Sequence, residues 1–157
     1  MINVSLKKGD MAPQFTLRDH LGNEHSLEDF KGKKIVLYFY PKDDTPGCTD
    51  EALQFKDLYE EFQQKDTIII GISKDSEKSH QKFIDKYELP FILLSDPELE
   101  TIKAYDVWAL KKKFGKEYYG ISRSTFVIDE EGIIQEVFLN VKVKDHGNEI
   151  KECILRI

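Results

Sequence analysis

The stretch IVLYFYPKDDTPGCTDEALQFKDLYEEFQQKDTIIIGI, residues 35–72, decides the fold of this chain. It opens with six apolar residues, Ile35 to Tyr40, and closes with a second, largely apolar run over residues 67–72. Continuous apolar runs of this length are typical of strands that are covered on both faces of a sheet. Between them, apolar residues recur at helical spacing from Ala52 to Phe62. Strand, helix and strand in this order predict a βαβ unit with parallel strands.

The flanking segments extend this unit to the thioredoxin-like plan. We therefore expect an α/β fold in which helices flank a central mixed sheet, with an N-terminal hairpin as an extension. The expected elements are a hairpin around residues 19–23, helices over residues 76–87 and 97–105, strands over residues 91–94, 124–128 and 133–138, and a C-terminal amphipathic helix from about residue 145, with Ile150, Cys153, Ile154 and Ile157 on its apolar face.

Length and composition predict a single domain over residues 1–157. Hydrophobic residues make up 40% of the chain and charged residues 33%, and the sequence contains no repeats or Gly/Ser linkers. No apolar run approaches the roughly 18 residues of a membrane helix. The N-terminus lacks the apolar segment of a secretory signal, so we expect a cytoplasmic protein without membrane contacts.

The charge balance argues against nucleic acid as a partner. The 23 basic and 29 acidic residues give a net charge of −6, which repels a phosphate backbone. One local basic run, residues 111–116 (KKKFGK), is interpreted as a solvated loop.

Cys48 is the residue from which a functional interpretation starts. It lies where the first buried strand passes into the helix, with Thr45 as the expected N-cap and Pro46 as the first helical residue. Unpaired backbone N–H groups and the helix dipole favour the thiolate there, and the thiolate is the reactive form. The negative charges of Asp50 and Glu51 nearby disfavour the thiolate, so a cation is expected to compensate. Arg123, just before an apolar strand, is the best candidate.

Other site types have weaker signals. No CxxC motif is present, which excludes dithiol exchange of the thioredoxin kind. No glycine-rich phosphate loop appears, and we expect neither a cofactor nor a metal. The histidines lack ligand spacing and are expected at the surface; they are His20, His25, His80 and His146. A small buried hydrophobe remains the alternative interpretation of Cys48.

At this point the sequence resembles the peroxiredoxins. The segment Pro41-x-x-x-Thr45-x-x-Cys48 is similar to their active-site signature, and residues 122–129 (SRSTFVID) resemble their arginine-bearing strand. The longer string over residues 40–49 is similar to the subgroup called bacterioferritin comigratory protein, or peroxiredoxin Q. Further matches lie at residues 9–15, 107–108 and 120–121, so the resemblance spans nearly the whole chain.

The resemblance implies a role for each of five residues. Cys48 would be the peroxidatic cysteine, which attacks a peroxide oxygen and becomes a sulfenic acid. Arg123 would keep the thiolate ionised and bind the peroxide, Thr45 would hydrogen-bond the substrate, Pro41 would shield the sulfur from water, and Glu51 would orient Arg123. The implied activity is that of a thiol-dependent peroxidase acting on hydrogen peroxide and organic hydroperoxides. The implied reductant is thioredoxin, glutaredoxin or a small thiol.

The sequence departs from its subgroup five residues after Cys48. Many members have a resolving cysteine there, whereas this chain has Leu53. Cys153 is the other thiol, and its place on an apolar helix face favours a packed, inert residue. We therefore expect a one-cysteine mechanism with an external thiol reductant, in a monomer or weak homodimer. The alternatives are resolution by Cys153 and a thioredoxin-like binding module without turnover.

Overall fold

The predicted βαβ unit forms the centre of the fold in the computed structural model, which describes residues 5–157. β3 (Lys34–Phe39) and β4 (Thr67–Ser73) are parallel neighbours, and α1 (Pro46–Gln64) connects them. β5 (Ile92–Ser95) continues the parallel part beside β4. The register pairs Tyr38 with Gly71, where any side chain would collide with the Tyr38 ring. Both strands are buried along nearly their whole length, as the apolar runs in the sequence predicted.

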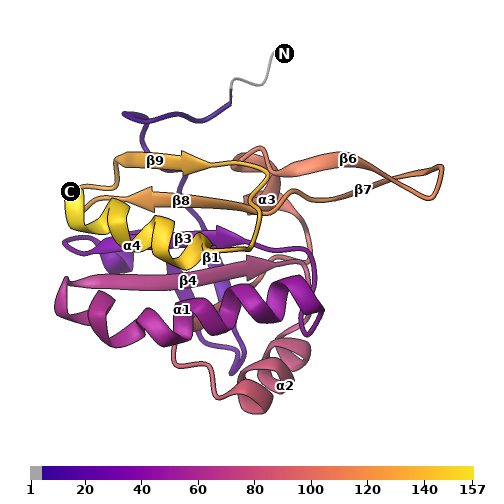
Figure 1. The fold of residues 1–157 in the computed structure, drawn as a ribbon, viewed down its shortest axis with the longest axis horizontal. Coiled ribbons are helices and arrows are strands. Elements are labelled where there is room, and N and C mark those ends of the chain that lie inside the picture. Colours follow the sequence, from indigo (N-terminus) through magenta and orange to yellow (C-terminus); the bar gives the residue numbers. More distant parts are fainter. Residues whose placement is uncertain (1–4) are drawn as a thin grey trace.

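Antiparallel strands complete the sheet on both sides, which makes it mixed. Within residues 5–157 it has seven strands, in the order β2-β1-β5-β4-β3-β8-β9. Figure 1 shows β4, β3, β8 and β9 side by side in this order. The remaining strands of this sheet are β1 (Thr16–Asp19), β2 (Glu24–Ser26), β8 (Ser124–Ile128) and β9 (Ile134–Phe138). The N-terminal hairpin and the 124–138 hairpin are thereby confirmed.

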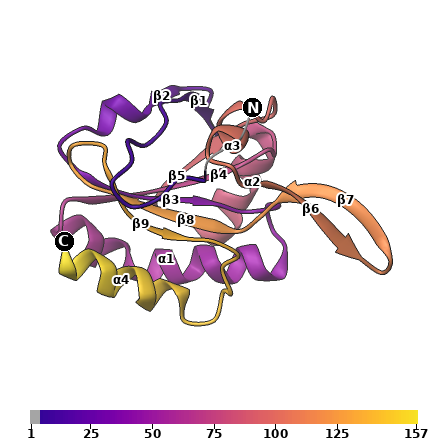
Figure 2. The same cartoon turned by 90° about the horizontal axis from the view of Figure 1, so that it is seen from above.

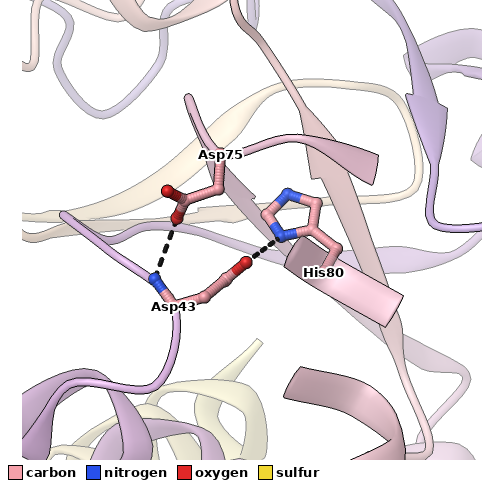
Figure 3. Close-up of side chains that lie close together, drawn as sticks. All are labelled: Asp43, Asp75 and His80. Atoms are coloured by element: carbon pink, nitrogen blue, oxygen red, sulfur yellow. Dashed lines mark hydrogen bonds and ion pairs between the residues drawn. The ribbon is translucent and has the colours of Figure 1, made fainter. Parts of the chain in front are cut away.

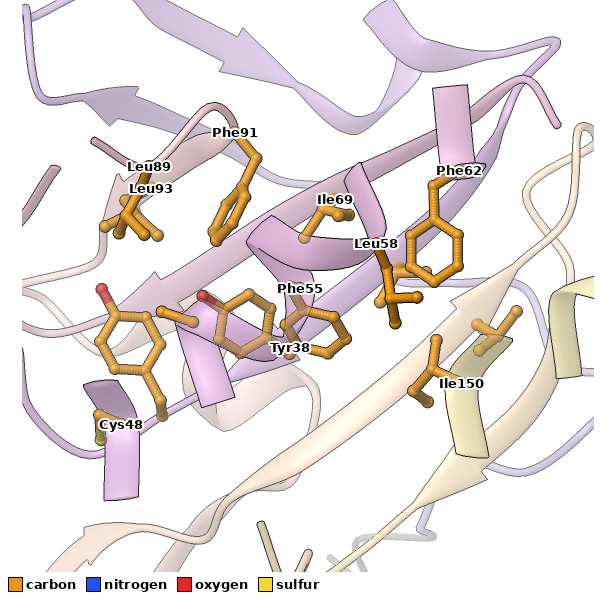
Figure 4. Close-up of a cluster of buried hydrophobic side chains, with 14 of the residues drawn as sticks. Tyr38, Cys48, Phe55, Leu58, Phe62, Ile69, Leu89, Phe91, Leu93 and Ile150 are labelled. Atoms are coloured by element: carbon orange, nitrogen blue, oxygen red, sulfur yellow. The ribbon is translucent and has the colours of Figure 1, made fainter. Parts of the chain in front are cut away.

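Helices cover the sheet on both faces. α1, α2 (Glu77–Tyr87) and α4 (His146–Arg156) bury their apolar sides against one face, in a core that includes Cys48 and Cys153. The 3₁₀ helix η1 (Leu27–Phe30) and α3 (Glu100–Ala104) contribute to the core on the other face. Figure 2 shows α1 and α4 together below the sheet and α3 above it. Part of the first core is drawn in Figure 4, with Cys48 at its margin near Tyr38.

Three local expectations were wrong. The basic run is not a loop: β6 (Trp108–Lys113) and β7 (Lys116–Ile121) pair as a separate hairpin that projects from the body (Figure 2). Phe114 and Gly115 at its tip have φ of 54° and 76°, the conformation that a two-residue hairpin turn requires. The helix expected over residues 97–105 is shorter, because only α3 is helical there. Ile157, expected on the apolar face of the C-terminal helix, lies after the end of α4 and is 42% exposed.

Among residues 5–157, no helix combines the length and the apolar character that a membrane span requires.

Candidate active site

The start of α1 places Cys48 in the first helical turn. Thr45 is the N-cap in an extended conformation and Pro46 is the first helical residue, so Cys48 is the third. Residues 41–45, which follow β3 and end at this N-cap, form the 41–45 loop. Because the first-turn N–H groups lack intrahelical partners, they point their positive ends toward this region. The Cys48 side chain is nevertheless 2% exposed, so it lies beneath the surface.

Arg123 lies beside the sulfur, as expected. Its Nη2 is 3.4 Å from Cys48 Sγ, and its Nη1 donates a 2.8 Å hydrogen bond to Glu51 Oε1. The backbone at Arg123 joins β7 to β8, and β8 pairs with β3 in the sheet. Strand pairing therefore brings a residue 75 positions away in the sequence to the start of α1. One guanidinium contacts both the thiol and a buried carboxylate.

Gly47 makes this close approach possible. A Cβ atom at this position would lie 3.0 Å from Arg123 Nη2 and 3.9 Å from a methyl group of Val143. The group that approaches the backbone here is the Arg123 guanidinium.

Glu51 is the buried partner of the arginine. Its side chain is 1% exposed, and burial raises its pKa to about 7, although the Arg123 guanidinium opposes this shift. Oε2 has no hydrogen-bond partner among the described residues, and His146 Nε2 lies 4.0 Å from it. Burial lowers the pKa of His146, whose ring is also hydrogen-bonded to Thr125 and Glu149. An imidazole with a lowered pKa therefore lies behind the carboxylate.

The same charges act on Arg123. Burial works against the guanidinium charge, but the attraction of Glu51 and Cys48 outweighs it and raises the arginine pKa further. Arg123 is consequently a fixed cation next to the sulfur.

Thr45 and Pro41 lie on the loop that leads to Cys48. Both are half-buried. Thr45 does not cap the helix with its side chain, because Oγ1 donates a 2.8 Å hydrogen bond to the Lys42 carbonyl instead. A hydroxyl has one proton, so Thr45 Oγ1 keeps only acceptor capacity for any further partner.

Cys153 lies in a different environment. It is also 2% exposed, among the apolar side chains of α4 and the sheet, and burial raises the pKa of its thiol. The ion pair between Lys151 and Glu61 (3.0 Å) places this part of α4 beside the C-terminal half of α1. Since 13 helical residues separate Glu61 from Cys48, the two thiols are about 20 Å apart along α1.

Two groups near the 41–45 loop were not expected from the sequence. Asp43 is buried and accepts a 2.6 Å hydrogen bond from the hydroxyl of Tyr40. His80 and His146 are fully buried, so their placement at the surface was wrong. His80 Nδ1 lies 2.7 Å from Asp43 Oδ2 (Figure 3). The two aspartates at residues 43–44 gave a weak indication of such a contact. They follow an apolar strand, and an aspartate that is buried there needs a hydrogen-bond partner.

Asp43, His80 and Asp75 form a cluster of side chains of the types that bind metals. One donor atom from each lies within 4.8 Å of the others. These atoms already satisfy one another and nearby groups through hydrogen bonds, since Asp75 Oδ2 accepts from the Asp43 backbone N–H at 2.8 Å and from Ser73. The arrangement is that of a hydrogen-bonded cluster between the loop and α2.

Comparison with known proteins decides the family. The protein-family model described as AhpC/TSA family matches residues 8–137. Peroxiredoxin Bcp of Bacillus subtilis is 53% identical over 151 residues, which cover 96% of either chain. The chain is a peroxiredoxin of the AhpC/TSA family. A putative peroxiredoxin bcp of Coxiella burnetii is 51% identical and covers 94% of this peroxiredoxin and 97% of its relative.

Solved structures agree with the fold of this peroxiredoxin. A cysteine-to-serine variant of Xylella fastidiosa PrxQ superposes with a TM-score of 0.92, at 34% identity and 98% coverage of both chains. Xanthomonas campestris peroxiredoxin Q gives a TM-score of 0.86, at 38% identity and 90% coverage. The expected thioredoxin-like α/β fold is confirmed, and so is the resemblance to the bacterioferritin comigratory protein subgroup. Peroxiredoxins are thiol-dependent peroxidases, and this one is therefore an oxidoreductase.

Proposed function

We propose that Cys48 is the peroxidatic cysteine and that Arg123 is the residue that activates it. The observation that supports this assignment is the 3.4 Å contact between Arg123 Nη2 and Cys48 Sγ in a buried site. An arginine at this distance favours the thiolate and offers a planar set of donors to a peroxide oxygen.

The first half-reaction oxidises Cys48. The thiolate sulfur attacks one oxygen of ROOH, a sulfur–oxygen bond forms and the O–O bond breaks. The bonding pair leaves with the distal oxygen, which takes up a proton and departs as ROH or water. Negative charge develops on that oxygen, where donors fixed in a water-poor site are worth most. Arg123 supplies such donors, and the first-turn N–H groups of α1 add to them.

Thr45, Pro41 and Glu51 are proposed as supporting groups. The Thr45 hydroxyl already donates its hydrogen bond to the Lys42 carbonyl, so it would accept a hydrogen bond from the O–H of the peroxide. Pro41, half-buried on the 41–45 loop, would limit water at the sulfur. Glu51 would orient Arg123 through the 2.8 Å bond to Nη1.

The second half-reaction is proposed to use an external thiol. A thiol RSH attacks the sulfenic acid, giving a mixed disulfide and water, and a second thiol then releases Cys48 as RSSR forms. The placement of Cys153 supports this one-cysteine mechanism, because about 20 Å of helix separates it from Cys48. A disulfide requires Cα atoms within about 7 Å. Peroxiredoxins are reduced by thiols; thioredoxin, glutaredoxin or a small thiol is the proposed class here.

The remaining assignments are also proposals. We infer that residues 1–157 are one domain, supported by a hydrophobic core on each face of one sheet. We further infer a monomer or weak homodimer and a cytoplasmic location; for the latter the support is that neither cysteine forms a disulfide. Family membership favours turnover over a binding module without activity.

Consumption of dithiothreitol that depends on added peroxide tests the activity. The mechanism is tested by mass spectrometry after one equivalent of peroxide without reductant. A gain of one oxygen on the peptide containing Cys48 is expected. Loss of two hydrogens or a doubled mass would instead indicate a disulfide within or between chains, and would overturn the one-cysteine assignment.

A further inference from the structure

The 41–45 loop is tied to α2 through the buried carboxylate of Asp43. Oδ1 accepts from the Tyr40 hydroxyl at 2.6 Å, and Oδ2 accepts from the Ser79 hydroxyl at 2.8 Å and lies 2.7 Å from His80 Nδ1. The backbone N–H of Asp43 donates to Asp75 at 2.8 Å. Figure 3 shows two of these contacts, from the Asp43 carboxylate to His80 and from the Asp43 backbone to Asp75. Asp43 is thus anchored through both its side chain and its backbone.

His80 is fixed from its other side as well. Its Nε2 lies 2.9 Å from the carbonyl oxygen of Leu94, which can only accept, so Nε2 carries a proton and donates it. One further proton lies between Nδ1 and the Asp43 carboxylate. A hydrogen bond of this kind is charge-assisted, and His80 is 0% exposed, so water cannot replace either partner.

The neighbouring aspartate makes a similar but exposed contact. Asp44 accepts from Lys86 Nζ at 2.8 Å and from the Tyr87 hydroxyl at 2.7 Å, also on α2. Both partners of its ion pair are substantially exposed, so solvent and salt weaken it. Of the two links between the loop and α2, the buried one is the stronger.

The loop leads directly to Cys48. It ends at Thr45, the N-cap of α1, three residues before a sulfur that is 2% exposed. A thiol reductant is larger than a small peroxide and must contact the sulfur itself, for which a buried sulfur leaves little room. We therefore expect the loop to stay in place for oxidation and to move for reduction.

We propose that the Asp43–His80 pair is the latch that holds the 41–45 loop closed, and that His80 is a positioning residue for the peroxide reaction. The inference rests on the proposed role of Cys48. His80 does not touch the sulfur; it acts through Asp43 on the segment that sets Thr45 and the first turn of α1. Opening the latch lowers the peroxide rate and raises the accessibility of Cys48.

Two substitutions of His80 distinguish a role in the hydrogen bond to Asp43 from a role in packing alone. The amide of asparagine places a donor near the position of Nδ1, facing Asp43, whereas the amide of glutamine places it near Nε2, facing Leu94. His80→Asn thus preserves the bond of the latch, and His80→Gln preserves the bond on the far side. The first measurement is stopped-flow oxidation of Cys48 by hydrogen peroxide. The second is its alkylation by iodoacetamide, assigned to Cys48 by peptide mass spectrometry.

For His80→Gln we expect peroxide oxidation to slow at least about tenfold and alkylation to speed up at least about tenfold, because loss of a buried charge-assisted bond shifts the opening equilibrium by that order. His80→Asn should stay within about threefold of wild type in both rates. Asp44→Asn should show a smaller effect than His80→Gln in both.

Leu27→Ala provides the control for general destabilisation, since Leu27 is buried in the core on the opposite face of the sheet. If His80→Gln matches Leu27→Ala in both rates, or if the two His80 variants behave alike, the latch is disproved. Parallel decreases in oxidation and alkylation would also disprove it. If wild type fails to react with peroxide, the proposed function fails, and the alkylation rates alone still decide the latch.

Discussion

The two cysteines of this chain are equally buried and chemically unlike. Cys48 and Cys153 are each 2% exposed and belong to the same hydrophobic core. Cys48 lies in a first helical turn, 3.4 Å from a guanidinium, whereas Cys153 lies inside a terminal helix where burial raises the pKa of its thiol. The two thiols therefore share their burial but differ in the charges and backbone donors around them. Such surroundings are what set the reactivity of a thiol.

The largest expected effect is the difference in peroxidase activity between serine variants of the two cysteines. Cys48→Ser should abolish peroxidase activity, because serine at this position cannot be oxidised to a sulfenic acid. Cys153→Ser should keep most of the activity when a small thiol is the reductant. Steady-state consumption of peroxide with dithiothreitol measures both. A Cys153→Ser protein that is folded but loses turnover would reverse the comparison and make Cys153 the resolving cysteine.

The next largest effect concerns the cation that distinguishes Cys48. Arg123→Lys keeps the charge but loses the planar fork that contacts Glu51 and the sulfur together. We expect oxidation by peroxide to slow by at least about tenfold, roughly 1.4 kcal/mol of transition-state stabilisation. Stopped-flow oxidation of Cys48 at neutral pH measures it. Equal rates in the two proteins would remove Arg123 from the mechanism.

A third cysteine, introduced at position 53, would test the effect of the missing resolving thiol. With no resolving cysteine in α1, the sulfenic acid should be prone to a second oxidation to the sulfinic acid, which is generally irreversible. Leu53→Cys should form a peroxide-induced disulfide with Cys48 and resist this inactivation. Five helical residues rise about 7.5 Å and turn about 500°, so the first turns of α1 must unwind before the bond closes.

The measurement is the mass of the Cys48 peptide after a large excess of peroxide, with Leu53→Ala as the matched control. Wild type and Leu53→Ala should both gain two oxygens. Survival of wild type without a sulfinic mass would point to another protective thiol, first of all Cys153.

The remaining expected effect is on the pH dependence of stability rather than on a rate, and it comes from Glu51. Its folded pKa of about 7 lies above the ordinary value of 4.5, because the carboxyl is buried. The native state therefore holds this proton more tightly than the unfolded state does. The contribution to stability is complete below about pH 4.5 and is lost as the pH rises through about 7.

Urea unfolding at several pH values should thus show wild type losing about 1–3 kcal/mol between about pH 5 and 8 relative to Glu51→Gln, which cannot titrate there. Parallel stability curves for the two proteins would mean that the native carboxyl is ionised throughout this range.

Much of the fold and the centre of the site could be predicted from the sequence, for identifiable reasons. The runs at β3 and β4 are apolar without interruption, and the first turn of α1 has its Thr-Pro signal in adjacent residues. Arg123 followed from charge compensation. In contrast, nothing local indicates that His80 is buried, because its partners Asp43 and Leu94 come from two other segments.

The basic hairpin was missed for a related reason. The lysines of residues 111–116 suggested a solvated loop, and they are indeed largely exposed. The strand pairing depends instead on the backbone of Phe114 and Gly115, whose positive φ values close the turn. Side-chain charge carries little information about main-chain pairing in a two-stranded ribbon.

That ribbon has a consequence for how the protein can be modified. β6 and β7 leave the body and return to it just before Arg123, and their base is closed by a 2.7 Å hydrogen bond from the Ser122 N–H to the Val107 carbonyl. A change in length at the tip, where Phe114 is 93% exposed, is absorbed by the ribbon before it reaches that closure. The exposed tip of the arm thus offers an attachment point for a dye or an affinity tag.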